Sequence, residues 1–169
     1  MNAHDGVVGQ AEGRRTVDAD TLVEDVRLLL REAEIRAVGR AAGMGVVEFT
    51  GPQGEDLRVH IQCAFRIFHD GRAVLGSRDM AYAPDSVGPE AFDTFSIVYD
   101  TCAALLTCVM AGARPRVQEV HVGNDGTLTV EATRGLRVGA FPGASPAEAE
   151  SWRAFQRHGP HYGHPPEVI

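Results

Sequence analysis

The stretch Leu-Arg-Val-His-Ile-Gln-Cys-Ala-Phe-Arg-Ile-Phe, residues 57–68, is the longest β-strand candidate in the chain. Apolar residues dominate it, and the Asp70-Gly71 dipeptide that follows is typical of a two-residue hairpin turn. Residues 73–77 then return to a strand pattern. The stretch therefore predicts an antiparallel hairpin, and with it an antiparallel sheet.

The rest of the chain adds more strands and two main helices. Further strand candidates are residues 35–40, 46–50, 117–122, 127–133, 136–141 and 152–157. A capping-box spacing at residues 21–24 opens an apolar stripe, which predicts a helix over residues 20–33. A second stripe begins after Pro89 and ends at Gly112 and Pro115, which predicts a longer helix. Because this order lacks βαβ alternation, we expect an α+β fold with one antiparallel, twisted sheet of about seven to eight strands.

A second passage repeats the pattern of the first. Leu57-Arg58-Val59 is followed by Phe65-Arg66-Ile67-Phe68, and Leu136-Arg137-Val138 is followed by Trp152-Arg153-Ala154-Phe155. Each reads Leu-Arg-Val and then aromatic-Arg-apolar-Phe, with a longer interval in the second passage. The repeat predicts two related halves of the sheet, and chance similarity in a strand-rich chain is the alternative.

The 169 residues suffice for one domain of ordinary size. We expect a loose amino-terminal arm over residues 1–16, a single α+β domain over residues 17–162, and a tail over residues 163–169. A Ser-Pro-Ala-Glu sequence at residues 145–148 predicts one further helical turn.

The composition excludes several classes of function. Acidic residues outnumber basic ones 23 to 16, which gives a net charge of −7 and favours a basic partner over nucleic acid or an anionic membrane. All basic residues are arginine, so lysine chemistry such as Schiff-base formation is excluded. The chain shows neither a signal-peptide pattern nor an apolar run of roughly 20 residues, and its three cysteines fit free thiols, so we expect a cytoplasmic protein.

Two groups of polar residues are candidates for a site. His60 and Gln62 share one face of a strand and, beside Arg66, could form the floor of a polar pocket, or simply a cross-strand hydrogen-bond ladder. Arg66 and Arg153 recur in the repeat, and a buried arginine needs a paired carboxylate. Their expected partners are Asp79 and Glu150, which a resemblance to a protein family singles out. Such pairs would fix the sheet, or the two guanidinium groups would hold an anionic ligand. The candidate pocket residues are His60, Gln62, Arg66, Asp79, Glu150, Trp152 and Arg153.

His158, His161 and His164 have the most metal-like spacing in the chain. They could bind zinc or nickel, or they could form a tail that gains charge below roughly pH 6.5. The sequence has no phosphate-binding loop, nucleophile elbow or dinucleotide fingerprint, so no cofactor is expected.

Residues 57–66, the Gly76-Ser77-Arg78-Asp79 stretch, and Glu150 with Trp152-Arg153 and His158 or His161 resemble the pattern of a family of small, actinobacterial-looking bacterial proteins. The resemblance covers residues 34–162, and Phe65 stands where the family usually has Trp. The family has no established activity, and some such small acidic proteins look like immunity proteins. The resemblance therefore implies a protein that binds and neutralises a toxin.

We accordingly expect a non-catalytic cytoplasmic binding protein, immunity-like, that acts on a basic protein partner. The alternative is a small-molecule-binding protein or an enzyme with a polar pocket around His60, Gln62, Arg66 and Arg153.

Overall fold

The structure is a computed structural model that describes residues 19–80, 90–143 and 149–166. The predicted arm (1–16) and the helical turn predicted at residues 145–148 lie outside these ranges. The elements in chain order are α1 (Ala19–Leu30), β1 (Glu34–Ala41), β2 (Met44–Thr50), β3 (Asp56–Ile61), β4 (Ala64–His69), β5 (Arg72–Gly76), the 3-10 helix η1 (Ser77–Met80), α2 (Glu90–Ala113), β6 (Val117–Val122), β7 (Leu128–Ala132), β8 (Leu136–Phe141), β9 (Trp152–Gln156) and β10 (His161–His164). None of the helices in the described ranges is long and apolar enough to cross a membrane.

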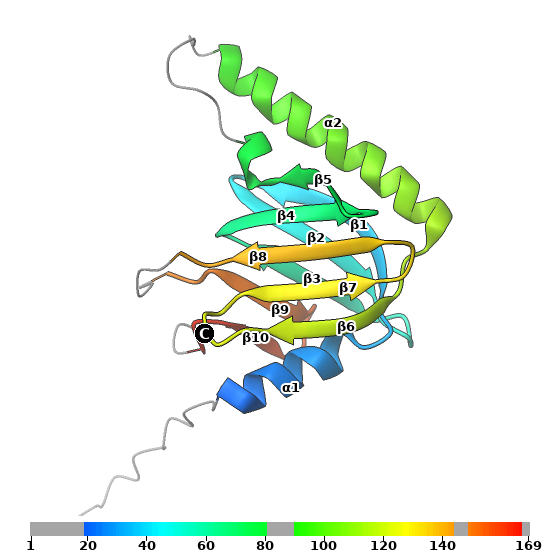
Figure 1. Cartoon of the computed structure of the whole chain (residues 1–169), viewed down its shortest axis with the longest axis vertical. Coiled ribbons are helices and arrows are strands. Elements are labelled where there is room, and N and C mark those ends of the chain that lie inside the picture. The colour runs from blue at the N-terminus through cyan, green and yellow to red at the C-terminus, as the bar shows by residue number, and fades with distance from the viewer. Residues whose placement is uncertain (1–18, 81–89, 144–148, 167–169) are drawn as a thin grey trace, which may run out of the picture.

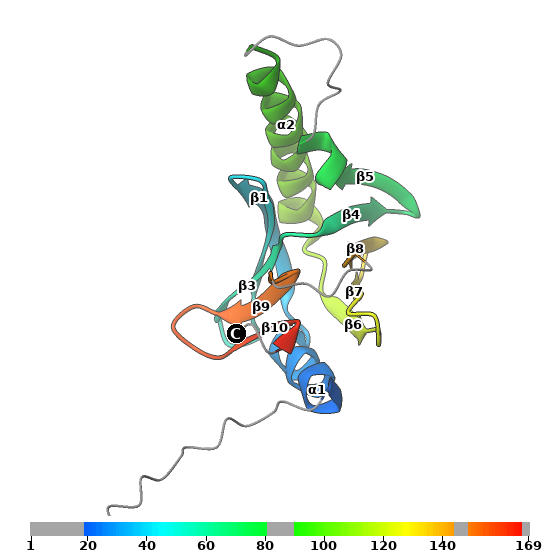
Figure 2. The same ribbon diagram turned by 90° about the vertical axis from the view of Figure 1, so that its left-hand side faces the viewer.

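The α+β class and the antiparallel pairing are confirmed, but the single sheet is wrong. The strands form two five-stranded sheets, here called sheet A (β1-β2-β3-β9-β10) and sheet B (β5-β4-β8-β7-β6). Figure 2 shows them as two layers, and the chain crosses from one layer to the other where β3 passes into β4. One hydrophobic core, with residues of both sheets and both helices, fills the space between them.

The stretch of residues 57–68 is divided between the two sheets, which explains the error. It breaks at Gln62 and Cys63, whose backbone N–H groups both donate to the carbonyl oxygen of Ser151, at 2.8 and 3.1 Å. This shared acceptor ends pairing in sheet A and sends the chain into sheet B. Alternation alone could not predict the break, because buried side chains continue on both sides of it.

The two-halves prediction agrees with the topology. Each half runs helix, three-stranded meander, two-stranded hairpin: α1 with β1 to β5, then α2 with β6 to β10. The meander of each half lies in its own sheet, and the hairpin crosses to pair with the meander of the other half. Each sheet therefore contains strands from both halves.

The strand register repeats as well as the order. In sheet B, Phe65, Ile67 and His69 lie opposite Ala140, Val138 and Leu136, and in sheet A their equivalents Trp152, Ala154 and Gln156 lie opposite Ile61, Val59 and Leu57. The bulge at Ile35/Ala37 in β1 has its counterpart at Val117/Glu119 in β6. Reciprocal backbone hydrogen bonds from Ile35 to Pro115 and from Val117 to Ala33, both 2.8 Å, join the starts of β1 and β6. The molecule is thus pseudo-twofold symmetric about this junction.

Each helix covers an edge strand of the opposite half. α2 packs on β1 and α1 packs on β6, at opposite ends of the molecule (Figures 1 and 2). At the equivalent edge positions, Thr107 of α2 accepts a hydrogen bond from the Val38 N–H at 3.1 Å and donates to the Val38 carbonyl at 3.3 Å, and Arg27 of α1 donates to the Val120 carbonyl at 3.1 Å. The helices therefore satisfy polar groups that an edge strand would leave open.

Two boundaries differ from the prediction. α1 ends at Leu30 rather than at residue 33, because Glu32 adopts a left-handed conformation with φ of 56° that stops the helix. β10 extends to His164 and pairs with β9, so strand structure reaches two residues into the tail expected over residues 163–169.

Candidate binding face on sheet A

Four of the seven candidate residues lie together on the side of sheet A that faces away from sheet B. Alternation along β3 buries Leu57, Val59 and Ile61 in the core and turns His60 outward. The same alternation along β9 turns Arg153 outward, opposite His60 in the strand register. Gln62 and Glu150 stand just beyond the ends of these strands. We call this surface, formed by the outward side chains of β1, β2, β3, β9 and β10 with their immediate neighbours, the sheet A face.

Glu150 organises the polar part of the sheet A face. Arg153 donates to its carboxylate through Nε at 2.8 Å and Nη2 at 2.5 Å, and Gln62 donates to it through Nε2 at 3.2 Å. The Glu150 side chain is only 9% exposed, compared with 32% for Arg153. The predicted pairing of Arg153 with Glu150 is therefore confirmed, and it holds the arginine in place.

A row of rings lies beside this ion pair. The His60 ring meets the edge of Phe155 at 4.7 Å between centroids, and Phe155 stacks on His161 at 4.8 Å with planes 21° apart. Nδ1 of His161 lies 3.4 Å from Nη1 of Arg153. The rings and the ion pair thus form one continuous group across β3, β9 and β10.

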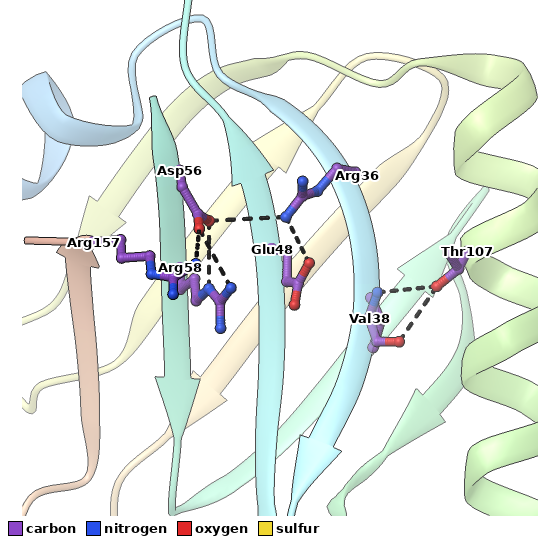
Figure 3. Close-up of polar contacts among 7 residues, drawn as sticks. All are labelled: Arg36, Val38, Glu48, Asp56, Arg58, Thr107 and Arg157. Carbon is purple, nitrogen blue, oxygen red and sulfur yellow. Dashed lines mark hydrogen bonds and ion pairs between the residues drawn. The ribbon is translucent and has the colours of Figure 1, made fainter. Parts of the chain in front are cut away.

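Three arginines surround one carboxylate at the other end of the sheet A face (Figure 3). Asp56 lies 3.3 Å from Arg58, 3.7 Å from Arg157 and 3.8 Å from Arg36, and Arg36 also contacts Glu48 at 2.7 Å. Hydrogen bonds from Arg58 and the charges of Arg36 and Arg157 lower the pKa of Asp56 below its ordinary value. The carboxylate therefore stays ionised near neutral pH.

The two titratable groups His60 and Cys63 both favour their neutral forms. Burial, together with the charges of Arg58 and Arg153, lowers the pKa of His60, so its ring is neutral at pH 7. Burial raises the pKa of the Cys63 thiol, which favours the unreactive protonated form.

The other three candidate residues lie elsewhere. Arg66 and Asp79 line a hollow of about 300 Å³ beside β4, β5 and η1, and no ion pair joins them among the contacts of the described residues. Asp79 instead accepts a hydrogen bond from the backbone N–H of Gly76 at 2.8 Å. Trp152 points into the core, where it is fully buried and donates to the Gly126 carbonyl at 2.7 Å.

The three histidines of the tail have separate surroundings. His161 belongs to the sheet A face, His164 stacks on Trp152 on the opposite side of sheet A, and His158 lies exposed in the turn between β9 and β10. Within the described ranges no group of three His, Cys, Asp or Glu residues is arranged to hold a metal ion.

Sequence reasoning did not include Phe155 or the arginines around Asp56 in the site. Phe155 could have been found, because it lies two residues after Arg153 in a predicted strand and therefore on the same face. Arg36 and Arg157 are brought to Asp56 by the pairing of β1, β2, β3 and β9, which no local pattern reveals.

No protein-family model, curated protein or solved structure matches the chain. The fold and the site together define the class: a pseudo-symmetric α+β protein that presents arginines and aromatic rings on one sheet face.

Proposed function

We propose that the protein is a non-catalytic binding protein that contacts a protein partner through the sheet A face. In the immunity-like form of this function, the partner is a toxin that the complex neutralises.

The convergence of both halves on one partly exposed surface, whose side chains are held by contacts with one another, carries the proposal. His60 comes from the first half, Glu150, Arg153, Phe155 and His161 come from the second, and each is held by a ring contact or a hydrogen bond. Side chains that are already fixed lose little entropy when a partner binds. Arginine and aromatic residues are also the types enriched at the energetic centres of protein interfaces.

The surroundings of the polar groups favour binding over catalysis. His60 packs on a phenylalanine ring, and Glu150 accepts hydrogen bonds from Arg153 and Gln62, so the two do not form an acid–base pair. The alternative pocket needs Arg66 next to His60, Gln62 and Arg153. Arg66 belongs to sheet B, where it lines a separate hollow.

The first experiment is native mass spectrometry of the protein purified gently from its own cells. We expect a stoichiometric protein partner that is retained by the wild type and lost from Phe155→Ala. The matched control is Phe68→Ala, at the equivalent position of sheet B, which should retain the partner. A small-molecule adduct without any protein partner would support the alternative function instead.

A further inference from the structure

We infer that the sheet A face accepts an acidic segment of the partner, with the arginines around Asp56 as its anchoring site. The inference rests on the proposed function and adds the chemistry of the contact. It replaces the expectation of a basic partner, which came from the net charge of the whole chain.

The charge around Asp56 is opposite to that of the whole chain. Glu34, which the strand register places on the same side of sheet A, is paired separately with Arg114 and Arg116. Among the other ion pairs of the sheet A face, four arginines (36, 58, 153 and 157) outnumber three carboxylates (Glu48, Asp56 and Glu150), whereas the chain carries 16 basic and 23 acidic residues. The surplus lies at the Asp56 end, where three arginines share two carboxylates. A partner that supplied carboxylates there would complete the charge balance.

The arginines at this end have hydrogen-bonding capacity to spare. Each guanidinium carries five N–H donors, and Arg58 directs Nε and Nη2 at Asp56 over long distances of 3.4 and 3.3 Å. Arg157 approaches only to 3.7 Å and its side chain is 62% exposed. A second carboxylate can therefore be bound without breaking a short ion pair, and bidentate pairing would make that contact strong.

Comparison of the two pseudo-equivalent faces shows that the arrangement is particular to sheet A. On sheet B, Arg137, the equivalent of Arg58, covers the Phe68 ring at 4.2 Å. The Phe141 ring lies over Gly139, the equivalent of His60, so closely that a Cβ there would be 2.7 Å from it. Arg137 thus lies on a ring where Arg58 contacts a carboxylate, and Phe141, which is 40% exposed, covers the position equivalent to His60.

Single-stranded nucleic acid could also use arginines and rings, and it is the main competing ligand. The acidic protein segment is favoured because a chain of net charge −7 repels a polyphosphate over distances longer than one contact, whereas a short acidic segment on a folded partner meets only the local surplus.

The test is a titration of the ¹⁵N-labelled full chain, followed by NMR, with a decaglutamate peptide, a decalysine peptide and a ten-nucleotide oligothymidylate at equal ionic strength. We expect decaglutamate to shift the amide signals of β2, β3 and β9 around Glu48, Arg58 and Phe155, with an effect that weakens as salt is added. Shifts confined to sheet B, stronger shifts with decalysine, or tighter binding of the oligothymidylate would overturn the inference.

Matched charge reversals complete the test. Arg58→Glu should weaken decaglutamate binding by about tenfold or more, because one attraction becomes a repulsion, and Arg137→Glu on sheet B should leave it within about twofold. Equal effects of the two variants would contradict the inference. Since Arg58→Glu could disturb Asp56, Arg157→Gln at the exposed margin serves as a milder second variant, with circular dichroism as the check on folding.

The same variants separate the inference from the proposed function. If the cellular partner is lost from Phe155→Ala but retained by Arg58→Glu and Arg157→Gln, the proposed binding function is supported. The inference that the partner supplies an acidic segment is then wrong. If no protein partner is found while decaglutamate still binds, the function fails and the anion site remains.

Discussion

The side chain of Trp152 connects the two sheets at a single residue. Its ring is fully buried in the core under sheet A, and its indole N–H donates to the Gly126 carbonyl in the turn between β6 and β7 of sheet B. Because this is the only tryptophan in the chain, its fluorescence reports directly on the contact between the sheets.

We expect Trp152→Phe to lower the free energy of unfolding by about 1–3 kcal/mol, since the phenyl ring leaves the Gly126 carbonyl without its donor. Urea denaturation followed by circular dichroism measures the loss. The control, Phe155→Leu on the outward side of the same strand, should cost less because Phe155 lies outside the core. A Trp152→Phe variant as stable as the wild type would show that the hydrogen bond contributes nothing.

The protonation of His60 makes the stability of the protein depend on pH. The fold lowers its pKa below the ordinary 6.5, so below that pH the unfolded chain binds a proton that the folded chain resists. The contribution of His60 to stability is therefore complete above pH 6.5 and is lost as the pH falls toward the lowered value.

Replacing His60 by Gln should reduce the loss of stability between pH 7 and pH 5, because this linkage disappears. Urea midpoints at the two pH values measure it. Thr101→Val, at an exposed position of α2, changes no titratable group; it is the control and should keep the wild-type dependence. Equal pH dependence of His60→Gln and the wild type would refute the assignment.

At the scale of elements, Thr107 of α2 supplies the partners for both backbone groups of Val38. We expect Thr107→Val, which keeps the shape but removes the hydroxyl, to destabilise the protein by about 1–3 kcal/mol. Thermal or urea unfolding checks this, with Thr101→Val on the exposed side of the same helix as control. A similar, small effect of the two variants would mean that water replaces the hydroxyl at the strand edge.

Local patterns predicted most of the elements but not their grouping. The hairpin after residue 70, the meander of the last third and the two helices follow from turn residues and apolar spacing. The break at Gln62 depends on an acceptor at Ser151, 89 positions further along the chain, and β10 depends on pairing with β9. Both are tertiary effects that no window of sequence contains.

At the scale of the whole molecule, the exchange of hairpins between sheets predicts that the halves cannot unfold separately. Losing the second half would remove β9 and β10 from sheet A together with most of sheet B. We expect one cooperative transition, with coincident urea curves from Trp152 fluorescence and circular dichroism. The double variant Trp152→Phe/Phe141→Trp moves the reporter to sheet B and should give a single transition too, whereas two separated transitions would contradict the interlocked arrangement.

The candidate site was predictable only in part, for the same reason. The repeat identified Arg153, and the family resemblance identified its partner Glu150, which lies three residues before it. The repeat also suggested that Arg66 and Arg153 act together, whereas pseudo-symmetry places equivalent residues on different sheets. If both copies of the repeat lay in one sheet, equivalent residues could lie side by side. Because each hairpin pairs with the other half's meander, equivalent residues lie on different sheets.

The exchange of hairpins between the two sheets also affects how the chain folds while it is being synthesised. During vectorial synthesis on the ribosome, β3 emerges long before β9, its neighbour in the finished sheet A. Its open edge, with alternating Leu57, Val59 and Ile61, stays available for pairing with other nascent chains until residues 152–164 have left the exit tunnel. A translation pause shortly before that segment would lengthen this exposure, so the yield of folded protein depends on how quickly the last strands are delivered.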